Sequence, residues 1–98
     1  MDLAASSGTP VKASKSGVVK EASWIGGYGN AVYIDHPDGT QTRYAHMSSL
    51  NVEEGDTVAQ GDVIGKVGST GVSTGPHLHF EIRVKGYAVD PLEYLVQP

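Results

Sequence analysis

Apolar and polar residues alternate over short stretches of this chain, and glycine, proline and asparagine separate these stretches. A period of two residues is typical of strands that bury one face. The pattern predicts short strands at residues 11–13, 18–24, 30–35, 42–46, 53–58, 61–67, 78–84 and 87–89. No stretch keeps the apolar period of a helix, so we predict an all-β fold, a barrel or sandwich of short strands.

The segments between the strands have their own sequence signals. A glycine cluster at 26–29 predicts a turn, and Pro-Asp-Gly-Thr at 37–40 predicts a hairpin turn. Residues 68–76 are rich in Gly, Ser and Thr and predict a loop. Near the C-terminus, Asp90 and Pro91 predict one helical turn over 90–95, with Asp90 as its N-cap.

The clearest strand carries two histidines one residue apart, in the stretch Gly-Pro-His-Leu-His-Phe-Glu at 75–81. Because successive side chains of a strand point to opposite faces, one set should enter the core: Leu78, Phe80, Ile82 and Val84. The other set shares the opposite face: His77, His79, Glu81 and Arg83. This spacing lets both imidazoles reach one zinc ion, or lets one hold a metal while the other faces a substrate. It is equally typical of the polar outer face of a half-buried strand.

The composition of the chain excludes several kinds of partner and of metal ligand. The chain has 98 residues, which fits one domain, and no cysteine, so disulfides and thiolate ligands are excluded. Its formal net charge is −4 and its seven Lys and Arg residues are scattered, which argues against nucleic acid as a partner. No apolar run approaches the roughly 20 residues of a membrane-spanning helix. Any metal must therefore be bound by His, Asp, Glu or backbone groups.

Most of the other histidines and aspartates have a structural explanation in the residues next to them. Turn formation explains five of them: Asp35, His36, Asp38, Asp56 and Asp62. His46 ends the strand predicted at 42–46, and Asp2 has no evident local role. The larger aromatic residues are candidates for the lining of a cleft, but core packing is expected for most of them: Trp24, Tyr28, Tyr33 and Tyr44.

Taken together, the glycine and histidine motifs resemble those of one family. The matching runs include Asp-Leu-Ala-Ala-Ser-Ser-Gly-Thr-Pro-Val at 2–11, Gly-Tyr-Gly-Asn at 27–30, Tyr-Ala-His-Met at 44–47, Val-Glu-Glu-Gly-Asp at 52–56, Gly-Asp-Val-Ile-Gly at 61–65 and Thr-Gly-Pro-His-Leu-His-Phe-Glu at 74–81. In combination they resemble the lysostaphin/LytM-type zinc metallopeptidases over essentially the whole chain.

This resemblance implies a duplicated hybrid motif, a β-rich fold, as a single domain over residues 1–98. It implies a zinc endopeptidase that cuts peptide bonds of bacterial peptidoglycan. By the same resemblance, Asp2 and His79 are ligands of one Zn2+, and His46 and His77 are catalytic residues whose proton-transfer roles stay open. The implied location is bacterial and outside the cytoplasm, in the periplasm, the cell envelope or the medium, with membrane anchoring of the parent protein left open.

One ligand of the family pattern has no counterpart here. The family's first zinc ligand is a His four residues before the Asp, and that position would precede Met1. We therefore expect a domain truncated at its N-terminus, which by itself binds zinc weakly and is a poor peptidase. The alternative is a non-catalytic domain of the same family, one that binds and activates cell-wall amidases.

Overall fold

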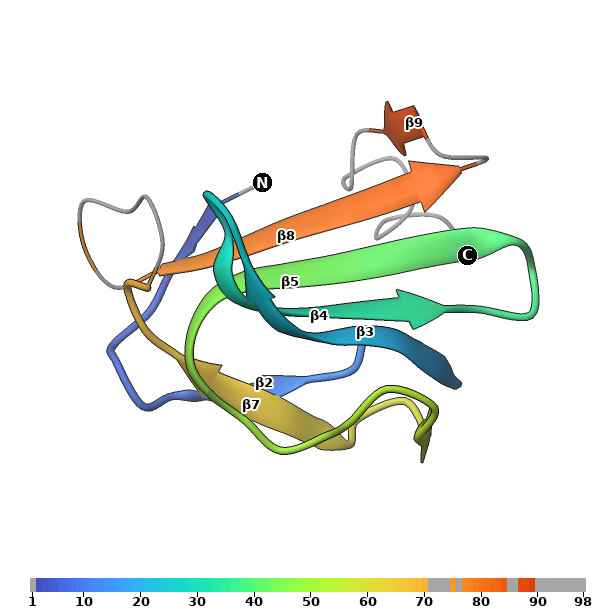
Figure 1. The fold of residues 1–98 in the computed structure, drawn as a ribbon, viewed down its shortest axis with the longest axis horizontal. Helices are drawn as coiled ribbons and strands as arrows, with labels where there is room; N and C mark the ends of the chain where they lie inside the picture. The colour runs from blue at the N-terminus through green and yellow to red at the C-terminus, as the bar shows by residue number, and fades with distance from the viewer. Residues whose placement is uncertain (1, 71–74, 76, 85–86, 90–98) are drawn as a thin grey trace.

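The computed structural model describes residues 2–70, 75, 77–84 and 87–89 (Figure 1). All regular structure within these residues is β-strand, so the all-β prediction is confirmed there. The strands are β1 (Asp2–Ala4), β2 (Pro10–Lys12), β3 (Gly17–Ile25), β4 (Gly29–Asp35), β5 (Thr40–Leu50), β6 (Thr57–Val58), β7 (Val63–Val67), β8 (His77–Val84) and β9 (Tyr87–Val89). The helical turn predicted at 90–95 lies outside the described residues. Among the described residues, no helix is long and apolar enough to cross a membrane.

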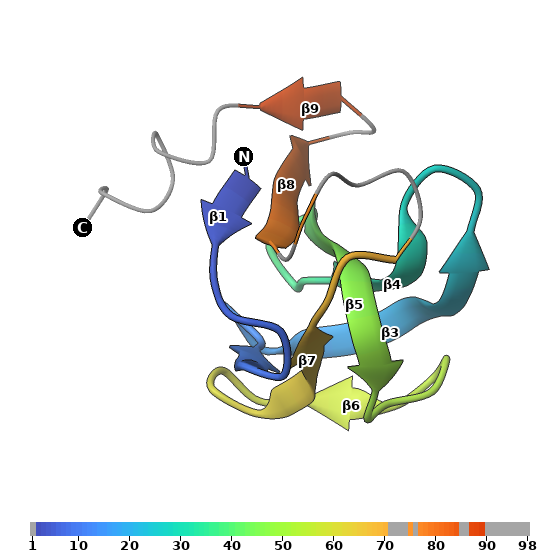
Figure 2. The same ribbon diagram turned by 90° about the vertical axis from the view of Figure 1, so that its left-hand side faces the viewer.

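The strands form one antiparallel, strongly curled sheet around β5. Along the main path, the order is β1-β8-β5-β4-β3-β6, and β9 pairs with the other part of β8. The first part of β5 lies between β8 and β4, whereas its last residues pair with β7, which in turn pairs with β2 (Figures 1 and 2). Because β5 passes from one group of partners to the other, the sheet folds over itself and encloses a core.

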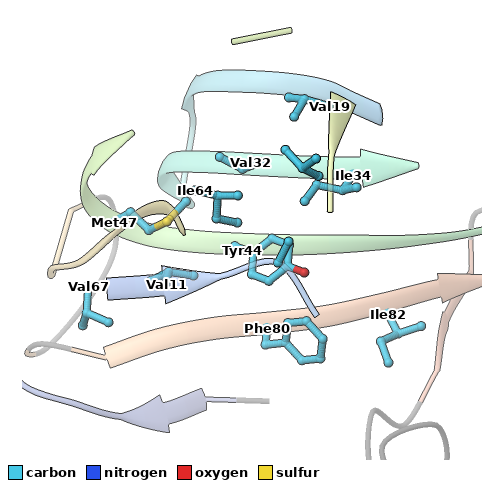
Figure 3. Packing of buried hydrophobic residues seen from close by; sticks show 12 residues of the cluster. Val11, Val19, Val32, Ile34, Tyr44, Met47, Ile64, Val67, Phe80 and Ile82 are labelled. Carbon is cyan, nitrogen blue, oxygen red and sulfur yellow. The ribbon is translucent and has the colours of Figure 1, made fainter. Parts of the chain in front are cut away.

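The core confirms the alternation read from the sequence. Of the four residues of β8 predicted to enter the core, Phe80 and Ile82 are buried and pack with side chains of β4, β5 and β7 (Figure 3). Leu78 is half-buried and packs against this cluster, whereas Val84 is half-buried and lies outside it. Tyr44 is the largest fully buried side chain, and its hydroxyl accepts a hydrogen bond from Thr42 and another from the Ser14 amide. The prediction that most of the larger aromatic residues pack in the core is wrong: Tyr28 and Tyr33 are half-buried, and Trp24 is 61% exposed.

Three of the five predicted turn residues close turns with their side chains, whereas Asp35 ends β4 and the His36 side chain is buried against Ser16 and Thr42. The Asp56 carboxylate accepts a hydrogen bond from the Glu53 amide, and the Asp62 carboxylate accepts one from the Ala59 amide. In the β4–β5 hairpin, Asp38 accepts hydrogen bonds from both the amide and the hydroxyl of Thr40. The hydrogen bonds of Asp56 and Asp62 thus close tight turns that contain glycines with positive φ, Gly55 and Gly61.

Three strands differ clearly from the sequence prediction: the strand predicted at 42–46 runs from Thr40 to Leu50, and the other two differences are as follows. Only Thr57–Val58 is a strand in the segment predicted at 53–58, because the preceding residues form the turn that Asp56 closes. In contrast, Asp2–Ala4 was not predicted as a strand and forms β1 against β8. Three residues are too few to display an alternation, so the pairing of β1 depends on its partner strand.

We expect Gly17→Ala to destabilise the protein, by about 1–3 kcal/mol as for other overpacked sites. A Cβ atom at Gly17 would lie 2.2 Å from the carbonyl oxygen of Asp35, so β3 and β4 would have to separate. Gly26→Ala is the matched control, since a Cβ there would meet no atom within 4 Å. Urea unfolding followed by circular dichroism measures both, and equal midpoints for the two variants would contradict this account of the β3–β4 contact.

Candidate functional site

The register of β8 brings together residues that are far apart in the sequence. His79 lies opposite Asp2 of β1 on one side and opposite Ala45 of β5 on the other. Residues directly opposite one another in antiparallel strands share a face of the sheet. Asp2 and His79 therefore occupy the face opposite to the one from which Phe80 and Ile82 enter the core.

The same register places His77 opposite Ala4, on the face that carries His79. Thus, the backbone brings the predicted site residues Asp2, His77 and His79 into one small area at the β1–β8 pair. The side chains of Asp2 and His77 lie outside the described part of the structure. Among the described residues, no group of three or more His, Cys, Asp or Glu side chains is placed to hold a metal.

His46 joins this area through a break in the alternation of β5. Val32 pairs with Tyr44 and Asn30 pairs with Met47, so two residues of β5 stand opposite one residue of β4. This is a β-bulge, and such a bulge can redirect a side chain. His46 within it has a φ of 61°, in the left-handed region, which costs about 1–3 kcal/mol for a residue other than glycine.

The bulge places the His46 ring beside the site rather than beside Tyr44. The ring centroids of His46 and His79 are 6.0 Å apart, in an edge-to-face arrangement. His46 is only 6% exposed. A regular strand would have put His46 on the face of Tyr44, which fills the core. The sequence pattern could not reveal this change of direction.

Hydrogen bonds fix the orientation of His46. Its amide donates to the carbonyl oxygen of Tyr28, at an N···O distance of 2.7 Å. Its Nδ1 lies 2.7 Å from the carbonyl oxygen of Thr70. A carbonyl oxygen can only accept, so Nδ1 carries the proton. In the neutral imidazole, the lone pair is then on Nε2, the nitrogen that can accept a proton or bind a metal.

His79 is held by a different set of contacts. Its ring stacks on Tyr28 with centroids 5.7 Å apart, and its Nε2 lies 2.8 Å from Oε2 of Glu81. The Tyr28 hydroxyl donates to the same Oε2 atom, and the Arg83 guanidinium donates to Oε1. Burial and the nearby Glu81 raise the pKa of the Tyr28 hydroxyl, so it remains a donor.

Glu81 is consequently ionised and acts as the acceptor in this network. Burial raises the pKa of the Glu81 carboxyl, but the hydrogen bonds that it accepts from three side chains outweigh this effect and lower its pKa to about 2. The Nε2–H group of His79 therefore donates a hydrogen bond to Oε2 of Glu81. A metal bound by the neutral His79 imidazole would be bound through Nδ1.

The sequence placed Glu81 on the correct face without a function of its own, offered Tyr28 only as one of four aromatic residues that could line a cleft, and gave no sign of Thr70. Alternation in β8 is a signal for Glu81, because it lies two residues beyond His79. Tyr28 follows a glycine turn and Thr70 belongs to a loop, and no periodicity links either residue to β8.

We expect Glu81→Gln to reduce the loss of stability in acid. Since the pKa of Glu81 is lower in the folded protein than its ordinary 4.5, its ionised form stabilises the fold above about pH 4.5. This contribution disappears as the pH falls toward about 2. Urea unfolding at a series of pH values measures the free energy of unfolding. Between about pH 2 and 4.5, this free energy should decrease less steeply with falling pH for Glu81→Gln than for the wild-type chain. Equal slopes would show that the Glu81 network does not stabilise the folded state.

Comparison with known proteins identifies the family of this chain. The model of peptidase family M23 matches residues 1–91. Over 92 residues, the chain is 54% identical to a DD-carboxypeptidase/endopeptidase Mpg from Neisseria meningitidis serogroup B, covering 94% of this chain and 21% of that protein. The chain thus spans about a fifth of the length of this curated relative.

Solved structures give the same fold. The catalytic domain of lysostaphin from Staphylococcus simulans superposes with a TM-score of 0.94 and 43% identity, over 98% of this chain and 77% of that one. A zinc-containing peptidase from Vibrio cholerae superposes with a TM-score of 0.87 and 38% identity, over 91% of this chain and 28% of that one. The lysostaphin-like fold implied by the motifs is therefore confirmed, and the chain belongs to peptidase family M23.

Proposed function

We propose that this chain is a zinc-dependent endopeptidase domain that hydrolyses peptide bonds of bacterial peptidoglycan. The observation that carries the proposal is the row across β1 and β8, in which Asp2 stands opposite His79, with His46 turned toward His79 by the bulge. Membership of family M23 supports it, as do a relative named as a DD-carboxypeptidase/endopeptidase and a similar structure described as a zinc-containing peptidase.

Asp2 and His79 would hold the zinc ion. Carboxylate oxygen and neutral imidazole nitrogen are ordinary zinc donors, and a catalytic site with three protein ligands keeps one position open for water. Glu81 fits this assignment, because ligating histidines usually donate their other ring nitrogen to a carboxylate or carbonyl group. The family pattern adds a third ligand four residues before Asp2, outside these 98 residues. When bound, the ion would supply Lewis acidity and lower the pKa of a coordinated water.

The other two histidines of the site, His46 and His77, would accept a proton and stabilise developing negative charge. The lone pair on Nε2 of His46 can accept a proton from an attacking water, because Nδ1 is already protonated and bound to Thr70. His77, on the face of His79, would then stabilise the negative charge that develops on the oxygen of the scissile carbonyl. The substrate class places the protein outside the cytoplasm, in the periplasm, the cell envelope or the medium.

We expect zinc binding to depend on a complete ligand set. The test compares the 98-residue chain with a version extended at its N-terminus so that a His stands four residues before Asp2. The extended version should bind one zinc ion, and the chain itself should bind zinc more weakly because water replaces a protein ligand. His79→Ala in the extended version should weaken binding by more than the roughly 10–100-fold typical of residues that only orient a ligand. Elemental analysis and isothermal titration measure these differences, and undiminished binding by His79→Ala would refute this ligand assignment.

We expect His46→Asn to slow hydrolysis strongly without loss of zinc. Asn tolerates the left-handed backbone of the bulge, so the fold should persist. The loss of a positioned base should lower kcat about 10²–10⁴-fold. Release of soluble fragments from purified peptidoglycan by the extended chain measures activity, and elemental analysis measures zinc. An extended chain that releases no fragments but binds a cell-wall amidase would favour the amidase-activator alternative.

A further inference from the structure

We infer that Thr70 is a positioning residue for His46: its hydroxyl anchors the loop after β7 to the bulge, and its carbonyl fixes the protonated nitrogen of the imidazole. The inference concerns how His46 is held, and it rests on the proposed function only for the catalytic importance of His46.

The Thr70 hydroxyl lies at the end of the bulge. It donates to the carbonyl oxygen of Met47, at an O···O distance of 2.7 Å, and accepts a hydrogen bond from the amide of Asn30 at 3.1 Å. Asn30 and Met47 are the register pair that resumes the β4–β5 ladder beyond the bulge. A single side chain thus bridges both strands at the point where the bulge ends.

The side chain of Asn30 reinforces this point. Its Nδ2 atom donates to the same Met47 carbonyl, at 3.1 Å. The Met47 carbonyl therefore accepts hydrogen bonds from both Thr70 and Asn30. This fixes the backbone immediately after His46, whose left-handed conformation is otherwise unfavourable for a histidine.

The main chain of Thr70 acts on the ring itself. Its carbonyl oxygen lies 2.7 Å from Nδ1 of His46 and requires the proton on that nitrogen. Because the hydroxyl of the same residue is tied to β4 and β5, the carbonyl is held in place relative to His46. Without the hydroxyl, the Thr70 carbonyl should no longer be held beside His46. The His46 ring should then no longer be restricted to the tautomer protonated at Nδ1.

His36 provides an internal reference for the test. Its Nδ1 also donates to a backbone carbonyl, that of Ser16, at 2.8 Å, and its Nε2 contacts the Thr42 hydroxyl. Neither Ser16 nor Thr42 is a hydrogen-bond partner of Thr70. A change at Thr70 should leave the ring signals of His36 unaltered, provided that the protein is folded.

The test is nitrogen-15 NMR of the imidazole rings in the metal-free 98-residue chain. Spectra are recorded over a series of pH values, and the tautomers are compared at the alkaline end of the series. The wild-type chain should show His46 protonated at Nδ1. In Thr70→Val, which keeps the shape but removes the hydroxyl, the His46 signal should move toward a mixture of tautomers. Thr70→Ser, which restores the hydroxyl, should recover the wild-type signal, and His36 should be constant throughout.

A folded Thr70→Val chain with the wild-type His46 tautomer would overturn the inference, as would a failure of Thr70→Ser to recover it. If Thr70→Val does not fold, Thr70→Ala removes the hydroxyl without placing a methyl group against Asn30. In the zinc-bound extended chain, Thr70→Val should lower kcat about 10–100-fold and leave the zinc affinity unchanged. Because the NMR measurement needs neither zinc nor substrate, failure of the proposed peptidase function would leave it intact.

Discussion

The antiparallel register of β8 is the constraint on which the rest of this structure depends. It pairs His79 with Asp2 on one side and with Ala45 on the other, while Phe80 pairs with Tyr44 inside the core. A slip of one residue would exchange the two faces and bury imidazole in place of Phe80. The cost of burying unpaired polar groups and losing apolar contacts therefore keeps the site residues in their row. The stability of the core and the geometry of the site are consequences of the same pairing.

The bulge in β5 is the local exception that completes the site. Regular alternation keeps Tyr44 in the core, and the one extra residue of the bulge then allows His46 to turn toward His79. The unfavourable backbone of His46 is offset by contacts from two separate segments, through the Tyr28 carbonyl and through Thr70. Strained residues of this kind persist only where surrounding structure fixes them, and they are common at functional sites.

Two imidazoles that lie 6.0 Å apart are held in opposite protonation patterns by different acceptors. A neutral backbone carbonyl accepts from Nδ1 of His46, whereas an ionised carboxylate accepts from Nε2 of His79. The carboxylate of Glu81 is itself kept ionised by Arg83 and by the Tyr28 hydroxyl. The arrangement leaves the lone pair on Nε2 in the neutral His46 ring and on Nδ1 in the neutral His79 ring, and separate roles as proton acceptor and metal ligand require such a difference.

The sequence by itself determined the all-β class, the core face of β8 and the carboxylates that close the turns, because these depend on alternation and on local turn chemistry. The combined motifs also identified the family, which the matching family model confirms. Only the tertiary structure decided that β1 pairs with β8, that His46 leaves the face of Tyr44, and that Tyr28 and Thr70 reach the histidines. These contacts join segments 24 to 77 residues apart, and no local period encodes which strands will meet or where a bulge will form.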